Sequence, residues 1–179
     1  MIDDNMSSIH YDLKKIKGIA FDVDGVLSPS TIPMSTEGEP LRMVNIKDGY
    51  ALQLAVKHGL QIAIISGGRT HAVEVRYHNL GVQSIYMGAG IKLPLFEEWR
   101  KKCGFELCEV AFVGDDIPDI QAMQAAGLAI AAADAAPEVK AVAQYISPHD
   151  GGQGVARDIL EQVMKAQGLW MDGQHAFGW

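Results

Sequence analysis

Short apolar runs rich in β-branched residues alternate along the chain with longer stretches in which apolar residues recur three and four positions apart. The apolar runs predict buried strands, because a parallel sheet is covered on both faces and its strands show little polar alternation. The strands are predicted at residues 16–23, 61–65, 84–87, 110–113 and 128–130. The longer stretches mostly end near glycine and predict helices. The helices are predicted at residues 49–58, 70–80, 93–102, 117–126, 137–143 and 157–166. This order predicts an α/β fold, a Rossmann-like three-layer α/β/α sandwich with a parallel sheet.

One segment, residues 27–47, interrupts the alternation between the first predicted strand and the first predicted helix. Extended stretches at 31–34 and 41–46 flank a Glu-Gly turn, so we expect a β-hairpin that projects from the sheet. Ligands bind beyond the carboxyl ends of strands in open α/β sheets, so this hairpin is expected to act as a flap or as an oligomer contact. No inserted second domain is predicted: residues 1–179 are expected to form one domain without a cap.

Composition and charge narrow the class of protein. The chain has 179 residues, 48% of them hydrophobic, and a formal net charge of −7. Such a chain buries roughly 70% of the surface its unfolded form exposes, which supports a core without metal or disulfides. The negative charge argues against a nucleic-acid partner, because phosphate backbones are bound by an excess of lysine and arginine. No apolar run approaches the ~18 residues of a membrane span, and no secretory signal is recognisable, so we expect a cytoplasmic protein with no membrane partner.

Carboxylates directly follow two of the predicted strands. Asp22 and Asp24, in the sequence DVDG, are two residues apart and so point to the same side of the first strand. A second group, GDDIPD, follows the strand at 110–113. Its acidic residues are Asp115, Asp116 and Asp119. Strand ends of a parallel sheet meet at one edge, so the two groups predict an oxygen-rich site that suits Mg²⁺. Taken alone, either group is also compatible with an ordinary turn, and Asp116 with a helix cap.

An anion site is predicted between these two acidic groups. The sequence Ser66-Gly-Gly-Arg69 follows one strand and precedes a helix, where a hydroxyl and free backbone N–H groups bind anions. Lys92 begins the next helix, a position that the helix dipole disfavours for lysine, which indicates another use for it. A plain strand-to-helix turn and a solvated surface lysine are the alternatives.

Taken in order, the DxD, Ser, Lys and GDDxxD motifs resemble those of the haloacid dehalogenase superfamily of phosphotransferases. A closer resemblance spans residue 16 to about residue 168. There FDVDGVLS, NIKDGYA, ISGGR, VGDDIPD and GGQGVARD look like the motifs of capless 3-deoxy-D-manno-octulosonate 8-phosphate phosphatases. This family implies a Mg²⁺-dependent homotetramer of lipopolysaccharide precursor biosynthesis, in which hairpin and C-terminal tail help complete a neighbour's site. Two features depart from it: Ser66 stands where Thr is frequent, and the aromatic tail at about 168–179 matches no family tail.

The residues and the resemblance together imply a two-step hydrolysis. Asp22 is expected to attack phosphorus and form an aspartyl-phosphate, the carboxylate form of covalent catalysis. Asp24 is expected to protonate the leaving alkoxide and then to deprotonate the hydrolytic water. The expected phosphate-binding residues are Ser66, Gly67 and Lys92. The expected metal ligands are Asp22, the Asp24 backbone carbonyl and Asp115, with Asp116 and Asp119 supporting them.

Five further residues are candidates for binding the sugar acid: Lys47, Asp48, Gly49, Arg69 and Arg157. The guanidinium of Arg157 suits bidentate pairing with a carboxylate, although a plain helix-surface arginine fits the sequence equally well. The expected substrate is 3-deoxy-D-manno-octulosonate 8-phosphate, and a nonulosonate 9-phosphate or another sugar phosphate is the alternative. A binding or scaffold protein that has kept the fold without activity is the non-enzymatic alternative, against which the intact motifs argue.

Overall fold

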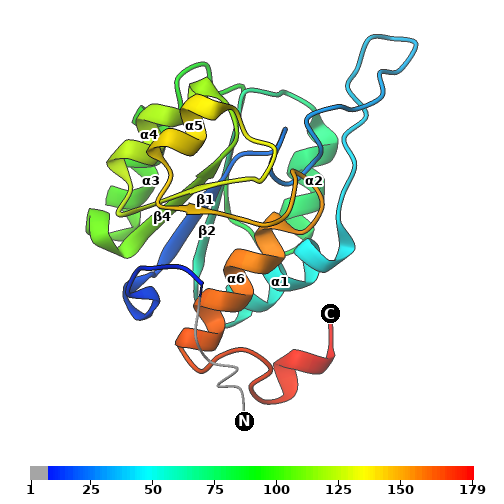
Figure 1. Ribbon diagram of the computed structural model, residues 1–179. Coiled ribbons are helices and arrows are strands. Elements are labelled where there is room, and N and C mark those ends of the chain that lie inside the picture. Colours follow the sequence, from blue (N-terminus) through cyan, green and yellow to red (C-terminus); the bar gives the residue numbers. More distant parts are fainter. Residues whose placement is uncertain (1–7) are drawn as a thin grey trace.

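The computed structural model describes residues 8–179, which form helices on both faces of one six-stranded sheet (Figure 1). The strands are β1 (Gly18–Phe21), β2 (Gln61–Ser66), β3 (Ser84–Met87), β4 (Val110–Gly114), β5 (Leu128–Ala131) and β6 (Tyr145–Ile146). They lie in the order β3-β2-β1-β4-β5-β6, and every neighbouring pair is parallel. The predicted fold class is therefore confirmed, and the two-residue strand β6 is an addition to the predicted sheet.

Within residues 8–179, six helices cover the sheet in two groups (Figure 1). They are α1 (Ile46–Lys57), α2 (His71–Asn79), α3 (Lys92–Cys103), α4 (Ile120–Ala125), α5 (Pro137–Val142) and α6 (Val155–Ala166). Helices α1 and α6 pack against each other beside α2, and α3, α4 and α5 lie on the other face. Helix α1 begins three residues before its predicted start, because the Asn45 side chain accepts hydrogen bonds from the backbone N–H groups of Lys47 and Asp48 and so caps it.

The described residues also form four short 3₁₀ turns: η1 (Leu13–Lys15) before β1, η2 (Leu107–Glu109) and η3 (Ile117–Asp119) on either side of β4, and η4 (Gln174–Phe177) after α6. The helix predicted at 117–126 is divided between η3 and α4, and Pro118 lies within the turn. Of the single domain expected over the whole chain, residues 1–7 lie outside the described part. Within residues 8–179, no helix combines the length and the apolar character that crossing a membrane requires.

The central strands are buried along their whole length, which explains their unbroken apolar runs. Every residue of β1, β4 and β5 is buried. Between the sheet and α3, the Phe96 ring packs 5.6 Å from that of Phe112 and 5.9 Å from that of Trp99, measured between centroids. Burying such aromatic side chains dominates the energetics of a core of this size.

The strand order sets the position of the functional residues. Strand β1 lies between β2 and β4, with Phe21 in register with Ile64 and Val113. The chain reverses its direction of winding at β1, and ligands bind at such a switch point beyond the carboxyl ends of the strands. The segments that follow β1, β2 and β4, which contain the predicted motifs, therefore meet at this edge.

The segment between β1 and α1 projects from the domain as a long loop (Figure 1). Its tip is closed by one antiparallel bridge, Met34 with Pro40, and by a hydrogen bond from the Leu41 N–H to the Pro33 carbonyl. The extended stretches predicted at 31–34 and 41–46 therefore pair only near the tip, so the projecting hairpin is shorter than expected. A two-stranded ribbon with neither a third strand nor a packed face is marginal in water, which accounts for the difference.

Candidate active site

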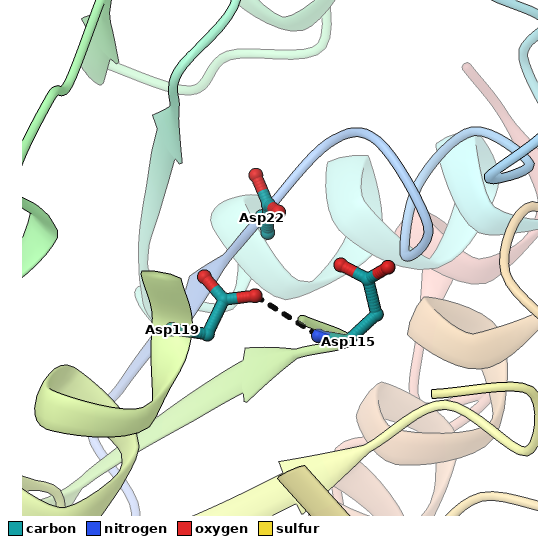
Figure 2. Close-up of side chains that lie close together, drawn as sticks. All are labelled: Asp22, Asp115 and Asp119. Atoms are coloured by element: carbon teal, nitrogen blue, oxygen red, sulfur yellow. Dashed lines mark hydrogen bonds between the residues drawn. The ribbon is translucent and has the colours of Figure 1, made fainter. Parts of the chain in front are cut away.

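Three carboxylates converge at the carboxyl edge of the sheet (Figure 2). Asp22 follows β1, Asp115 follows β4, and Asp119 closes the turn η3. One oxygen of each lies within 4.8 Å of the others, and both Asp22 and Asp119 are buried. The prediction that the two acidic motifs share one edge of the sheet is thus confirmed.

Lys92 supplies the positive charge of this cluster. It is the first residue of α3, and its side chain is only 5% exposed. Its Nζ lies 2.8 Å from Asp22 Oδ2 and 2.6 Å from Asp119 Oδ1. Burial by itself lowers the pKa of Lys92, but the two carboxylates outweigh it and raise the pKa above its ordinary value. Lys92 is therefore a buried cation, and the alternative of a solvated surface lysine is excluded.

Asp119 also shapes the backbone that carries the neighbouring acids. Its Oδ2 accepts hydrogen bonds from the backbone N–H of Asp115, at 3.0 Å, and of Asp116, at 3.3 Å (Figure 2 draws the first). The Asp116 side chain is exposed and accepts from the N–H of Ile117 at 2.8 Å. Asp116 thus caps the turn η3, as the alternative interpretation of its sequence position expected, while Asp119 orients Asp115.

The carboxylates are crowded beyond what one lysine can offset. Burial and the neighbouring charge of Asp119 raise the pKa of Asp22, and burial with the charges of Asp22 and Asp119 raises that of Asp115. The buried Oδ1 of Asp115 has no hydrogen-bond partner. Gly25, with φ of +87°, passes so close that a Cβ there would lie 1.8 Å from Asp115 Oδ2. A hard divalent cation fits this set of oxygens, because it would satisfy the unpaired oxygen and offset the excess negative charge.

The acidic cluster forms one wall of an open cavity of about 390 Å³. Ser66 and Gly67, at the end of β2, also line this cavity. The buried Ser66 hydroxyl accepts from the Gly68 N–H at 3.2 Å, which leaves its own O–H free to donate. Asp24 also lines the cavity, and its side chain is 39% exposed. A larger cavity, of about 680 Å³, lies at the opposite edge of the sheet and has no acidic residue in its lining.

The five residues predicted to bind the sugar acid do not line the 390 Å³ cavity of this chain. Lys47 and Arg69 are exposed, whereas Asp48 is buried between α1 and α6 and its Oδ1 accepts from the Arg157 N–H at 2.7 Å. The Arg157 guanidinium pairs with Glu161 at 2.8 Å and lies 4.5 Å from the Trp170 ring centroid. The structure thus gives Asp48 and Arg157 packing partners, and their role toward substrate stays a prediction.

One residue close to the cavity has no counterpart among the sequence predictions. Arg42, in the loop after β1, makes two hydrogen bonds of 2.8 Å to the carboxylate of Asp24. The sequence contained only a weak indication of this role. A single arginine stands among the apolar residues Leu41, Met43 and Val44 in a loop expected to face solvent.

Comparison with known proteins agrees with this geometry. Residues 45–127 match the family model of haloacid dehalogenase-like hydrolases. The chain is 37% identical over 155 residues to the 3-deoxy-D-manno-octulosonate 8-phosphate phosphatase KdsC of Escherichia coli, covering 87% of this chain and 82% of that protein. It is 34% identical over 152 residues to KdsC of Yersinia pestis, covering 85% and 81%.

Solved structures of such proteins superpose closely. The phosphatase from Moraxella catarrhalis, in complex with magnesium, phosphate and KDO, is 36% identical with a TM-score of 0.83, covering 88% of this chain and 90% of that one. The phosphatase from Yersinia pestis is 33% identical with a TM-score of 0.84, covering 88% and 85%. The chain therefore belongs to the haloacid dehalogenase-like hydrolases and, among them, to the family of the 3-deoxy-D-manno-octulosonate 8-phosphate phosphatases.

Proposed function

We propose that this chain is a Mg²⁺-dependent phosphatase that converts 3-deoxy-D-manno-octulosonate 8-phosphate into the free sugar acid and phosphate. The observation that carries the proposal is the convergence of Asp22, Asp115 and Asp119 around the buried Lys92 in one cavity. The relatives supply the substrate, because KdsC proteins are phosphatases of this compound and one related structure holds KDO with phosphate. The product is a precursor of lipopolysaccharide.

In the first half-reaction a carboxylate oxygen of Asp22 forms a bond to phosphorus, and the bond from phosphorus to the sugar oxygen breaks. The electron pair of that bond leaves with the sugar oxygen, which takes a proton from the Asp24 carboxyl group and departs as an alcohol. Asp22 is held for this attack, because its Oδ1 accepts from the Val23 N–H at 2.6 Å and its Oδ2 from Lys92.

In the second half-reaction a water molecule attacks the phosphorus of the aspartyl-phosphate while Asp24, now ionised, takes a proton from it. The bond from phosphorus to Asp22 breaks, which restores the Asp22 carboxylate and releases inorganic phosphate. Asp24 begins and ends the cycle with one proton, so the sum is one phosphate monoester and one water converted into one alcohol and one phosphate.

Phosphoryl transfer depends on stabilising the charge of the equatorial phosphoryl oxygens. Lys92, Ser66 and Gly67 all line the cavity, so the Lys92 ammonium, the Ser66 hydroxyl and the Gly67 backbone can donate hydrogen bonds to those oxygens. Mg²⁺ would be held by Asp22, the Asp24 backbone carbonyl and Asp115, with Asp119 behind them. Bound there, it supplies the positive charge that offsets both the carboxylates and the substrate phosphate.

Substrate identity is tested by comparing kcat/KM over phosphorylated eight-carbon and nine-carbon ulosonates and simple hexose phosphates. The proposal expects the eight-carbon 8-phosphate to give the highest value. A higher value for a nine-carbon 9-phosphate would move the assignment to that substrate, and no Mg²⁺-dependent hydrolysis of any phosphate monoester would leave a binding protein.

The metal site has a test that does not depend on turnover. Mg²⁺ at a hundred times its Kd should stabilise the wild-type protein by about 2.7 kcal/mol, read as an upward shift of Tm. Asp115→Asn should abolish this shift, and Asp134→Asn, whose carboxylate pairs with Ser30 and the Gly151 N–H, should keep it. An equal shift in the Asp115→Asn protein would remove Asp115 from the site. The homotetramer and the cytoplasmic location stay predictions, which sedimentation and cell fractionation test.

A further inference from the structure

Arg42 reverses the pattern of the loop in which it stands. Its neighbours Leu41 and Met43 are 51% and 50% exposed, yet the Arg42 side chain is only 8% exposed. Apolar side chains in water and a buried guanidinium are the opposite of what the hydrophobic effect alone produces. Specific contacts must therefore hold Arg42 inward, and they offset the entropy cost of ordering a long side chain on an exposed loop.

Those contacts converge on the acid–base residue. Arg42 Nε donates to Asp24 Oδ1 and one terminal nitrogen donates to Asp24 Oδ2, both at 2.8 Å, while the other terminal nitrogen donates to the Thr70 hydroxyl. The rotation of an aspartate about its last side-chain bond has only broad preferences, so a single contact leaves its aim loose. Two parallel bonds from a planar fork fix that rotation and still leave a second lone pair on each oxygen free.

The turn after β2 is shaped to admit the guanidinium. A Cβ on Gly68 would lie 2.4 Å from the terminal nitrogen of Arg42 that bonds Asp24 and 3.0 Å from its central carbon. The φ of Gly68 lies outside the left-handed region, so a side chain there would meet Arg42 rather than strain the backbone. The absence of a side chain at residue 68 thus makes room for the Arg42–Asp24 pair.

We propose that Arg42 is a positioning residue for Asp24, which it orients for both proton transfers, and that Gly68 provides the space this needs. The inference rests on the proposed function, because it gives Asp24 the acid–base role. It assigns a function to the loop after β1, because this loop contains the guanidinium that orients the carboxyl group of Asp24. Arg42 lies outside the lining of the catalytic cavity and acts through Asp24.

The test varies the leaving group of the substrate. Release of a sugar alkoxide needs a proton from Asp24, whereas release of 4-nitrophenolate from 4-nitrophenyl phosphate needs almost none. For Arg42→Lys, which keeps the charge but loses the fork, we expect kcat on a sugar phosphate to fall about 10- to 100-fold with KM within about threefold. With 4-nitrophenyl phosphate, a rapid burst of one nitrophenolate per site should be followed by slow turnover, because hydrolysis of the aspartyl-phosphate still needs Asp24.

Two further variants serve as references for Arg42→Lys. Asp24→Asn should show the same pattern with a larger loss on the sugar phosphate, about 10²- to 10⁴-fold. Arg100→Lys is the matched control, since Arg100 is also a largely buried arginine, paired with Glu97 and the Phe105 carbonyl but remote from the cavity. It should keep wild-type kinetics on both substrates, and melting curves should show all the variants folded.

Gly68→Ala gives a second check, because it keeps both partners and places a methyl group where the fork lies, at a residue that also lines the cavity. It should reproduce the burst, and its effect should not add to that of Arg42→Lys in the double variant. Additive effects, or a loss in KM alone, would mean that the methyl group or Arg42 contacts substrate instead, and would overturn the proposal. Equal losses on both substrates without a burst would overturn it as well. Any alkyl phosphate that the wild-type protein hydrolyses serves here, so a wrong sugar assignment leaves this test intact.

Discussion

Asp22 at the edge of the sheet and Asp48 between α1 and α6 are both almost fully buried, at 6% and 2% exposed, yet their surroundings differ. Asp22 lies against two other carboxylates and a buried lysine, on the wall of an open cavity. Asp48 accepts one backbone hydrogen bond from Arg157, and its buried Oδ2 has no hydrogen-bond partner. The first is a charged cluster that opens to a ligand, and the second is a single acid inside a helix interface.

Burial raises the pKa of both acids, but the consequence differs. At the sheet edge a cation from solution can offset the repulsion between the carboxylates, so this repulsion favours the binding of a cation. Asp48 belongs to no such cluster of acidic side chains among residues 8–179, so at the helix interface protonation relieves the cost of burial. A raised carboxyl pKa therefore indicates a functional site only where the geometry brings several groups to an open cavity.

The strongest test of this contrast is Asp22→Asn. The variant cannot form the aspartyl-phosphate, and we expect kcat to fall by at least about 10⁴-fold. Removing one of three crowded carboxylates should leave the free energy of unfolding unchanged within about 1 kcal/mol, or raise it. Steady-state kinetics and denaturant unfolding measure the two effects, and near-wild-type turnover would sink the assignment of Asp22 as nucleophile.

Lys92→Met tests the cation of the cluster. Without it, Asp22 and Asp119 face each other unpaired, and we expect the free energy of unfolding to fall by about 3 kcal/mol in the absence of Mg²⁺. We expect kcat to fall about 10²- to 10³-fold, because a donor to the phosphoryl oxygens is lost. Lys101→Met on the same helix is the matched control: its exposed pair with Glu97 should contribute less than about 1 kcal/mol. An equal fall in the free energy of unfolding of the two variants would show that the buried ion pairs of Lys92 stabilise the protein no more than an exposed pair does.

The Asp48 side of the contrast has a pH signature. Burial raises the pKa of Asp48 to about 6, against the hydrogen bond from the Arg157 N–H and the positive charges of His149 and Arg157, which lower it. The folded state therefore prefers the neutral acid, so stability from this group is complete below pH 4 and is lost as the pH rises through 6. A shift of this size corresponds to about 2–3 kcal/mol.

Asp48→Asn removes the titration and keeps an oxygen for the Arg157 N–H. We expect it to be more stable than the wild-type protein at pH 8, with an advantage that shrinks toward pH 4. Denaturant unfolding at several pH values measures the difference. A constant difference across this range would show that Asp48 is ionised throughout in the folded protein.

The position of a residue could be predicted from the sequence where a regular element of secondary structure determines it. Strand ends of a parallel sheet share an edge, so Asp22 and Asp115 could be brought together without coordinates. Arg42 could not be placed in this way, because its pairing with Asp24 crosses an irregular loop with no period to follow. The packing of Arg157 could not be predicted for a related reason: the rings that neighbour it, Tyr50 and Trp170, come from different parts of the chain and meet only through packing.

The smallest effect concerns the aromatic tail, which matches no tail of the family and to which the sequence assigned no role. In this chain the tail folds back on its own α1: the Tyr50 hydroxyl donates to the Ala176 carbonyl at 2.5 Å, and the Tyr50 ring lies 6.1 Å from that of Trp179. Deleting residues 173–179 should therefore lower the free energy of unfolding by about 1–2 kcal/mol and leave kcat/KM within about twofold.

Point variants distinguish a contribution of the tail to stability from a contribution to catalysis. Trp179→Ala should cause part of the loss in stability, whereas Phe177→Ala, whose side chain is 81% exposed, should cause almost none. If the truncated protein instead lost kcat/KM at unchanged stability, the tail would act at a catalytic site. Tyr50 contacts Arg157, whose N–H bonds Asp48, so the truncation should loosen the packing around Asp48. The acidic cluster around Asp22 should be unaffected.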